Sequence, residues 1–403
     1  MSIDLSHHDD LADIDVILDD LPDVAGTQHR LRERGPAVWA KAFGMPSLLL
    51  LSHELVHDAF RDEETFPAAD FYGNTVTDVM GRTMQCMRGD EHRLNRALVS
   101  PAFRQRLMPL IVPPLLEPVA HELIDRFVAR GEADLVADFT SRYPFIVITR
   151  LLGLPRHSEA EIRRWALGML DIQNSRDDAL ECARQFTEFV TPILAERRDD
   201  PGDDLLSTLA TTEIEGQRLT DEEIFGFLKL LFPAGADTTY LGLGSTLHAL
   251  LTHPDQLEIV RSDPAENARW AAEEAIRLDP PTAWIPRLAV RDIEWHGLSI
   301  PAWSSLMLGV MAANRDPAVF PDPDRFDVLR RPSGVLTFGF GTHFCLGAHL
   351  ARAEMQTALE VILQRLPDME LADDGGIRIT GTIHHLLRGP NRLPIRFSRR
   401  PSG

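Results

Sequence analysis

One short segment of this sequence combines a cysteine, a histidine and three glycines in a pattern that suits metal chemistry. It reads FGFGTHFCLG over residues 338–347, and its thiol belongs to Cys345. Glycine lets a backbone bend sharply and approach a flat group closely. Apolar residues at helical spacing follow, which predicts a helix over 348–366. The positive end of that helix favours a thiolate at Cys345, and loop amides can donate to the sulfur.

The residues of this loop alone leave two other interpretations open. A glycine-rich turn around a buried structural cysteine has the same composition. A zinc site would use His343, Cys345 and His349, but it lacks the fourth ligand and the Cys-x-x-Cys spacing of structural zinc sites.

A long apolar helix is the second segment with chemical potential. Thr220 and Glu223 form a capping box, and apolar residues continue from there to Leu251. About 30 residues at ~1.5 Å each give roughly 45 Å, enough to cross a whole domain. A helix that is apolar on most faces should be central. Pro233 in its middle removes a hydrogen bond and should distort it.

The distorted point of this helix reads AGADTT over residues 234–239. Mid-helix Asp and Thr compete with the backbone for hydrogen bonds, so Asp237 and Thr238 alone would suit a solvated or back-bonded pair. Together with Pro233 and Gly235 they indicate a helix opened over a cofactor, with room for dioxygen and water.

Two charged pairs have helical spacing. Glu274 and Arg277, three residues apart, share one helix face, as do His92 and Arg96, four apart. In isolation such pairs suit a solvated surface, where an ion pair contributes only about 0.3–0.5 kcal/mol.

These segments, in this order along the chain, resemble the cytochrome P-450 superfamily. The loop at 338–347 has every defined position of F-G-x-G-x-H-x-C-x-G, residues 234–239 resemble A-G-x-D-T-T, residues 274–277 resemble E-x-x-R and residues 92–96 resemble H-x-x-x-R. The resemblance covers nearly the whole chain. It implies a mainly α fold with a minor β region, a triangular helical prism around one buried haem, and a single domain over 1–403.

The resemblance also implies roles for individual residues. Cys345 would ligate the iron of haem b, Thr238 would act in oxygen activation, and Asp237 would deliver protons. Glu274, Arg277 and Arg325 would form a structural ion-pair network that braces the cysteine loop. The residues expected to bind the cofactor are His92, Arg96, Ala234, Arg287, Phe338, Gly339, His343, Cys345 and Gly347.

The activity implied is insertion of one oxygen atom from O2 into a hydrophobic organic substrate, by hydroxylation or epoxidation. NAD(P)H would act only indirectly, through a separate ferredoxin and its reductase. The docking surface for ferredoxin would lie on the cysteine side and use Arg93, Arg104, Arg106 and Arg352. A peroxide-driven peroxygenase would not need the acid–alcohol pair Asp237–Thr238, and a non-catalytic haem sensor would need neither residue.

The substrate pocket is expected to be apolar, by analogy with the same family. Met and Phe at helical spacing also occur in ordinary cores, so each position has a packing alternative. The pocket is expected to draw on residues 71–80, 169–172, 230–234, 283–285 and 386–387. The pocket residues expected within these segments are Phe71, Met80, Met169, Leu230, Ala283, Trp284, Ile285, Leu386 and Leu387.

The elements that must position these groups follow from patterning. The chain is mainly helical from about Asp90 to Asp279, and short strands are predicted at 47–51, 285–290, 293–295 and 305–310. The β portion is therefore drawn from both ends of the chain, and no linker divides it.

Composition excludes several other classes of protein. The 403 residues carry 41 basic and 61 acidic side chains, a net charge of −20, which argues against nucleic acid as a partner. Three cysteines are too few for a disulfide framework, which favours a reducing cytoplasm. The acidic N-terminus has no signal-peptide pattern, and no segment approaches ~18 uncharged apolar residues, so we expect no membrane anchor. We also expect a monomer.

Overall fold

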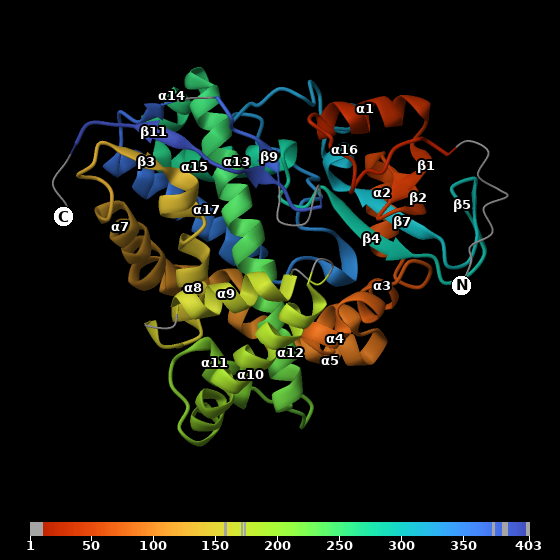
Figure 1. Ribbon diagram of the computed structural model, residues 1–403, viewed down its shortest axis with the longest axis horizontal. Coiled ribbons are helices and arrows are strands. Elements are labelled where there is room, and N and C mark those ends of the chain that lie inside the picture. The colour runs from red at the N-terminus through yellow and green to blue at the C-terminus, as the bar shows by residue number, and fades with distance from the viewer. Residues whose placement is uncertain are drawn as a thin grey trace.

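The computed structural model describes residues 11–156, 159–170, 172, 175–372, 375–380 and 386–399. The outermost parts of the expected polar N-terminal and basic C-terminal tails lie outside the described residues. Helices dominate the described chain (Figure 1). The helices are α1 (Val24–Arg34), α2 (His53–Arg61), α3 (Ala68–Thr75), α4 (Thr77–Met80), α5 (Gly89–Val99), α6 (Met108–Ile111), α7 (Glu117–Asp125), α8 (Tyr143–Leu151), α9 (Glu159–Leu170), α10 (Arg176–Asp199), α11 (Leu205–Thr211), α12 (Asp221–Phe232), α13 (Thr238–Thr252), α14 (Pro254–Ser262), α15 (Pro264–Leu278), α16 (Val310–Asn314) and α17 (Ala348–Arg365).

The strands are short and form small sheets. The largest sheet has the order β1-β2-β7-β4: an N-terminal antiparallel hairpin pairs in parallel with β7, and β4 pairs antiparallel on the other side. The predicted strands at 47–51, 285–290, 293–295 and 305–310 correspond to β2, β4, β5 and β7. The strands are β1 (Ala37–Ala42), β2 (Met45–Leu50), β3 (Glu132–Asp134), β4 (Trp284–Leu288), β5 (Ile293–Trp295), β6 (Leu298–Ile300), β7 (Ser305–Gly309), β8 (Glu370–Leu371), β9 (Ile379–Thr380), β10 (Gly389–Pro390) and β11 (Pro394–Arg396).

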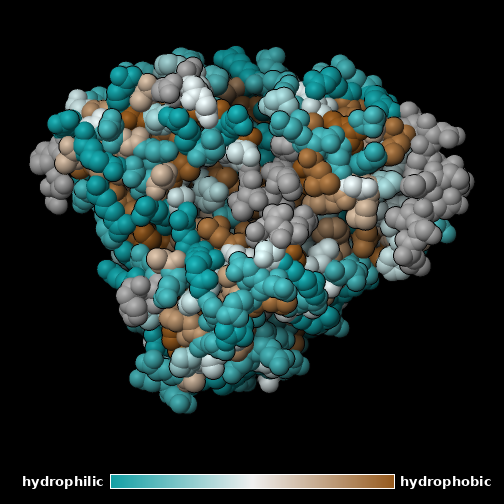
Figure 2. Space-filling model, in the orientation of Figure 1, coloured by the Kyte–Doolittle hydropathy of each residue, from teal (hydrophilic) through white to brown (hydrophobic). Residues whose placement is uncertain are grey.

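Both ends of the chain contribute to the β portion, as predicted. In the largest sheet Leu48 of β2 is paired with Leu306 of β7, and in a second sheet β3 and β8 flank β11 near the C-terminus. The largest sheet lies at one side of the molecule with α1, α2 and α16, while the helices fill the rest (Figure 1). The outline of the molecule is roughly triangular, with polar residues spread over the visible face (Figure 2).

The long apolar helix is central, as predicted. Helix α12 begins with the predicted capping box. The Thr220 hydroxyl accepts from the N–H of Glu223, and the Glu223 carboxylate accepts from the N–H of Thr220. Most residues of α13 are buried, and α13 packs against α15 and α17 in one apolar core. Helix α12 packs into a second core with α8, α9 and α10. The two cores meet along this helix, and the site lies where they meet.

One stretch of the described residues, Gly89–Asp125, is long and apolar enough by length and composition to cross a membrane. The sequence predicted no such segment. Buried helices of soluble proteins pass the same test, so one such stretch is weak evidence for a span. Here it consists of α5, α6 and α7, separated by 3-10 turns and a π turn, rather than one straight helix.

Candidate active site

A cavity of about 290 Å³ lies between the cysteine loop and the junction of α12 with α13. Segments from α5, β4 and the start of α17 complete its wall. The structure brings together every residue that the sequence assigned to cofactor binding, although these residues span more than 250 positions. All nine line the cavity: His92, Arg96, Ala234, Arg287, Phe338, Gly339, His343, Cys345 and Gly347.

The cysteine loop owes its shape to two glycines. Gly339 has φ of 69° and Gly341 has φ of 70°, a left-handed conformation that residues with a Cβ rarely adopt. A Cβ on Gly341 would lie 2.9 Å from the carbonyl oxygen of Phe60, so α2 packs directly on this loop. The Cys345 N–H donates to the Phe338 carbonyl at 2.9 Å and closes the loop. The closed loop presents the thiol to the cavity.

The electrostatics at Cys345 show two opposing effects. Burial raises the pKa of the thiol, while the N–H groups of Gly347 and Ala348 and the charges of Arg96 and Arg352 lower it. Burial outweighs the rest, so the pKa lies above its usual value. The N–H groups at the start of α17 thus favour the thiolate, as predicted, but in this structure burial has the larger effect on the pKa of Cys345. A metal cation bound at the sulfur would further stabilise the thiolate.

Helix α5 supplies two basic side chains to the cavity, as its i,i+4 spacing predicts. Arg96 donates to the carbonyl of Phe344 at 2.6 Å and so holds the residue before Cys345. His92 is 3% exposed, and its ring centroid lies 4.4 Å from that of His343. Burial, and then the charges of His343 and Arg96, lower the pKa of His92 to about 4. His92 is therefore neutral near pH 7.

Arg287 reaches the same region from strand β4. Its side chain is buried, one guanidinium nitrogen donates to the Pro286 carbonyl at 2.8 Å, and the group lies 5.8 Å from the ring centre of Phe60. Within the described chain, Arg287 Nε and His92 Nε2 are buried and have no hydrogen-bond partner. Buried polar groups without partners are costly, so these two atoms fit a polar, anionic ligand group in the cavity. The carboxylates of a haem have that chemistry.

Pro233 distorts the central helix, as predicted. Residues Pro233–Asp237 form a π-helical turn between α12 and α13. Ala234 and Thr238 face the cavity, and the Thr238 hydroxyl donates to the Ala234 carbonyl at 2.5 Å. Asp237 is fully buried and is not part of the cavity lining. The structure therefore places the alcohol of the expected pair at the cavity and the acid behind it.

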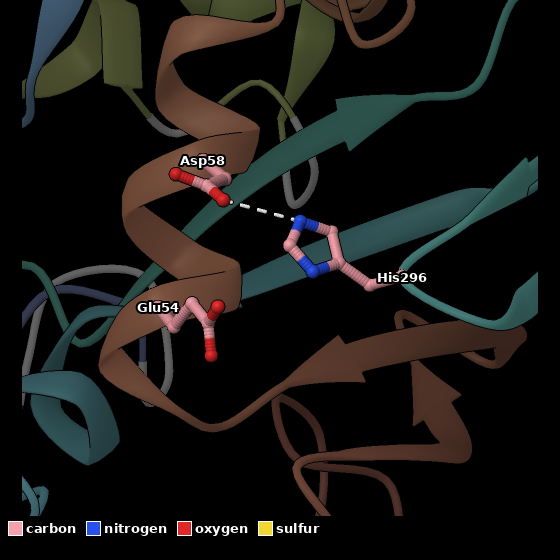
Figure 3. A group of neighbouring side chains, drawn as sticks. All are labelled: Glu54, Asp58 and His296. Atoms are coloured by element: carbon pink, nitrogen blue, oxygen red, sulfur yellow. Dashed lines mark ion pairs between the residues drawn. The ribbon is translucent and has the colours of Figure 1, made fainter.

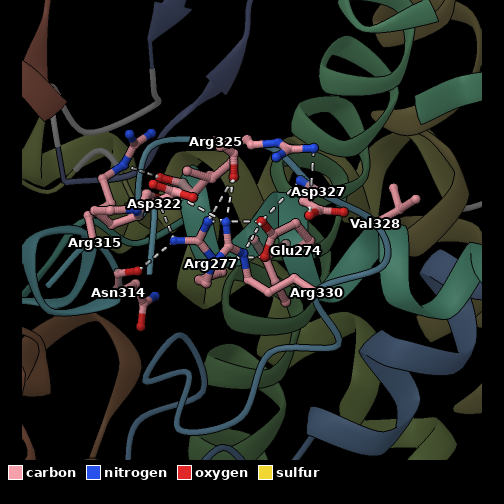
Figure 4. A network of polar contacts seen from close by, with 12 residues as sticks. Glu274, Arg277, Asn314, Arg315, Asp322, Arg325, Asp327, Val328 and Arg330 are labelled. Carbon is pink, nitrogen blue, oxygen red and sulfur yellow. Dashed lines mark hydrogen bonds and ion pairs between the residues drawn. The ribbon is translucent and has the colours of Figure 1, made fainter. Parts of the chain in front are cut away.

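The Glu274–Arg277 pair on α15 is fully buried (Figure 4). Arg277 donates to both Glu274 oxygens, at 2.8 and 2.9 Å. Its remaining donors meet the carbonyls of Asn314, Pro323 and Arg325, at 2.8, 2.7 and 3.3 Å. A buried charge with every donor satisfied is a rigid anchor, because breaking any of these bonds leaves an uncompensated group.

This anchor extends to the cysteine loop through Asn314. The Asn314 side chain accepts from the N–H of Leu336 at 2.8 Å and donates to the Thr337 hydroxyl at 2.9 Å. Thr337 in turn donates to the carbonyl of Ile276, between the two charged residues of α15. Thr337 is thus bonded directly to α15, and Leu336 is linked to Arg277 through Asn314, which is how the ion pair supports the loop.

The expectation for Arg325 is wrong in one respect. Its side chain is 65% exposed and only approaches Asp327, at 4.0 Å. Arg325 contributes its backbone carbonyl, which faces Arg277, so the side chain points outward (Figure 4). Arg330 takes the place expected for Arg325, because its Nε donates to Glu274 at 2.9 Å.

Only two of the nine expected substrate-pocket residues, Leu230 and Ile285, line the cavity. Side chains alternate along a strand, so Trp284 faces the core while Ile285 and Arg287 of the same strand face the cavity. Met80 and Met169 pack in the core of α8 to α12. Phe71, Ala283, Leu386 and Leu387 also lie outside the lining: Phe71 stacks edge-on with Tyr72, Ala283 is buried, and Leu387 pairs with Thr282.

Other residues form the wall in their place. Tyr72 on α3, Met84, Gln85, Phe227 and Leu231 line the cavity. Met84 and Gln85 lie in a short 3-10 turn before α5, where no periodic pattern marks them in the sequence. Phe227 lies four residues before Leu231 on α12, on the same helix face, a spacing that could have found it.

Glu354 on α17 is a cavity residue that sequence reasoning missed. It is 2% exposed, and burial raises its pKa well above the usual value, which favours the protonated carboxyl. Its Oε2 has no hydrogen-bond partner within the described chain. The sequence could have predicted its burial, because Glu354 lies four residues from both Leu350 and Ala358 on the buried face of its helix.

Two of the four arginines expected to form a docking surface are held in ion pairs. Arg93 contacts Asp90 at 3.2 Å and Glu215 at 3.0 Å, and Arg352 pairs with Glu273. Arg352 also lies over the ring of Phe338, 4.3 Å from its centre. Arg104 and Arg106 are exposed.

The described residues contain one group of three metal-ligating side chains, Glu54, Asp58 and His296, with ligand atoms within 4.8 Å of one another (Figure 3). Both oxygens of Asp58 already contact imidazoles, His57 and His296, each at 3.1 Å. These contacts account for the group as ion pairs at the surface. It does not include His343, Cys345 or His349, so the zinc alternative receives no support.

Known proteins share this sequence and fold. Residues 268–382 match the family model for Cytochrome P450. The 6-deoxyerythronolide B hydroxylase of Saccharopolyspora erythraea is 33% identical over 387 residues, which are 92% of this chain and 95% of that protein. A Steroid C26-monooxygenase of Mycolicibacterium smegmatis is 33% identical over 355 residues, 86% of each chain.

The solved structure of the polyketide-synthase cytochrome P450 PksS from Bacillus subtilis superimposes with a TM-score of 0.87 and 31% identity. It covers 93% of this chain and 97% of that one. The mainly α fold with small sheets is therefore shared. This chain belongs to the cytochrome P450 family, and it is a monooxygenase.

Proposed function

We propose that this protein inserts one oxygen atom from O2 into a bulky hydrophobic substrate, with electrons delivered by a separate iron–sulfur ferredoxin and its NAD(P)H-dependent reductase. The observation that carries the proposal is the convergence of all nine expected cofactor residues on one cavity, with the π-helical turn opposite the cysteine loop. We further propose that residues 1–403 act as one haem domain, monomeric and cytoplasmic.

Haem, when bound, supplies the iron at which dioxygen is reduced and cleaved. Cys345 is the group that would hold the iron, and Arg96 fixes the backbone next to it. His92, Arg287 and His343 would hold the haem carboxylates, since their side chains converge on one region of the cavity.

The Thr238 hydroxyl is positioned to pass a proton at the open turn of the central helix. It now donates to Ala234, and rotation about its χ1 bond would aim the hydroxyl into the cavity. Asp237 adjoins Thr238 in sequence and is buried outside the cavity lining, so a proton from Asp237 would reach the cavity through the Thr238 hydroxyl. Burial favours the protonated form of Glu354, which lines the cavity from α17.

The wall supports an apolar substrate that carries at least one polar group. Phe227, Leu230, Leu231 and Ile285 provide apolar surface, while the Gln85 amide adds a polar contact. Relatives whose names specify a macrolide precursor and a steroid fit this class of substrate.

The spectrum of the reduced protein under CO tests the haem assignment. We expect the red-shifted Soret band of a thiolate-ligated haem, and we expect Cys345→Ser to abolish it. Cys86→Ser and Cys182→Ser serve as controls, because both thiols are buried away from the cavity. A histidine-type band in folded protein would overturn the role of Cys345.

Turnover separates the monooxygenase from the alternatives. With NAD(P)H, a surrogate ferredoxin and its reductase, we expect product from an apolar substrate that also shifts the haem spin state. Product only with hydrogen peroxide would indicate a peroxygenase. Haem binding without product from any substrate that shifts the spin state would indicate a sensor.

A further inference from the structure

Glu63 lies directly behind the residues that would hold the haem carboxylates, although no sequence motif includes it. Its Oε1 lies 3.1 Å from Nε2 of His343, and both side chains are largely buried, at 21% and 14% exposure. The same oxygen accepts from the N–H of Ala68 at 3.1 Å. A carboxylate thus stands beside a group of side chains otherwise suited to binding anions.

The segment that carries Glu63 is held rigidly. Asp62 accepts from the N–H of Thr65 at 3.0 Å, and the ring of Phe66 is fully buried against Trp295, with ring centres 5.1 Å apart. The carbonyl of Thr65 accepts from Val290, just beyond β4. Glu63 therefore has little freedom to move away from His343.

Glu63 is ionised at neutral pH. Burial raises its pKa, but the hydrogen bond and the charge of His343 act against burial. The charge of Arg287 and the N–H of Ala68 lower the pKa further, so the balance lies below the usual value. The negative charge is a fixed feature of this wall.

We propose that Glu63 is a positioning residue that holds the His343 ring against the haem carboxylates and keeps the reduction potential of the haem low. The proposal rests on the proposed function, because it needs a haem in the cavity. Reduction adds one electron to the haem, and a nearby anion in a poorly solvated site raises the energy of the reduced form. His343 transmits the effect, since it lies between Glu63 and the cavity.

Glu64 provides a matched control. It is adjacent in sequence and carries the same charge, but it is 82% exposed and pairs with Arg291 at 3.1 Å. Water and salt screen such a surface charge. The Glu63→Gln and Glu64→Gln variants therefore remove the same charge from a buried and an exposed site.

The test is the midpoint potential of the haem in the purified, haem-loaded, substrate-free protein. We expect Glu63→Gln to shift it to a more positive value and Glu64→Gln to leave it at the wild-type value. Glu63→Asp, which retains the charge but draws it back by one methylene, should give a smaller shift in the same direction. An equal potential in wild type and Glu63→Gln would overturn the inference.

Each of the other possible outcomes also tests the proposal. If Glu63→Gln fails to fold, a zero or negative shift in Glu63→Asp overturns the inference. If wild type shows a thiolate-type CO spectrum but the Glu63 variants have the wild-type midpoint potential, only this proposal is overturned and the proposed function stands. A wild-type protein that binds no haem overturns both this proposal and the proposed function.

Discussion

The hydroxyl of Thr238 donates to the carbonyl of Ala234, 2.5 Å away, at the point where the central helix widens into a π turn. The bond satisfies a carbonyl that the irregular turn exposes to the cavity, and it holds the hydroxyl ready at the cavity wall. One side chain thus makes a structural contact and has the chemical role proposed for it.

Replacing Thr238 separates these two roles. We expect Thr238→Ala to bind haem and substrate normally, because the turn is fixed by Pro233 and by packing. Product formed per NAD(P)H should fall several-fold while hydrogen peroxide rises, since a proton donor at the cavity is lost. Thr238→Ser should remain close to wild type. Unchanged coupling in Thr238→Ala would remove the proposed role.

The buried ion pair on α15 predicts a large stability effect. Removal of one partner leaves a buried charge, so Arg277→Leu should cost about 3–5 kcal/mol in the free energy of unfolding and lower haem incorporation. Arg325→Ala should cost less than about 0.5 kcal/mol, because its exposed side chain takes no part and its carbonyl is retained. Denaturant unfolding measures both. Similar costs for the two variants would contradict this assignment.

Glu354 predicts a specific pH dependence. The folded protein keeps this carboxyl protonated above pH 4.5, whereas the unfolded chain ionises it, so the folded state binds more protons. Stability from this group therefore falls as pH rises above 4.5, by up to about 1.4 kcal/mol per pH unit. Glu354→Gln removes this contribution, so its stability relative to wild type should increase as the pH rises above 5 toward the raised pKa of Glu354. A constant difference across this range would show that the carboxyl is not held neutral.

Trp284 and Ile285 are neighbours on β4, but we expect one to affect stability and the other to affect substrate binding. Trp284→Ala should cost about 3–5 kcal/mol in stability, because the indole is fully buried in the core beside the largest sheet. Ile285→Ala should cost below about 2 kcal/mol but change which substrates shift the haem spin state, because Ile285 lines the cavity. A change of substrate preference in Trp284→Ala with none in Ile285→Ala would place the pocket on the other face of the strand.

The sequence by itself determined the chemistry of this protein. A glycine-rich loop with one thiol, a proline within an apolar helix and charged residues at i,i+3 or i,i+4 have local physical meanings that hold in any context. The distortion at Pro233 and the closely packed Gly341 were predictable for that reason, since backbone sterics do not depend on distant residues.

Only the tertiary structure decided which side chains share a wall. Trp284 and Ile285 are adjacent and both apolar, and the face that each presents depends on which side of β4 the core lies. The exchange of Arg325 for Arg330 depends on the path of an irregular segment, which has no periodicity to read. Glu63 and His343 are 280 positions apart, and their 3.1 Å contact exists because α2 packs on the cysteine loop and brings the two segments together.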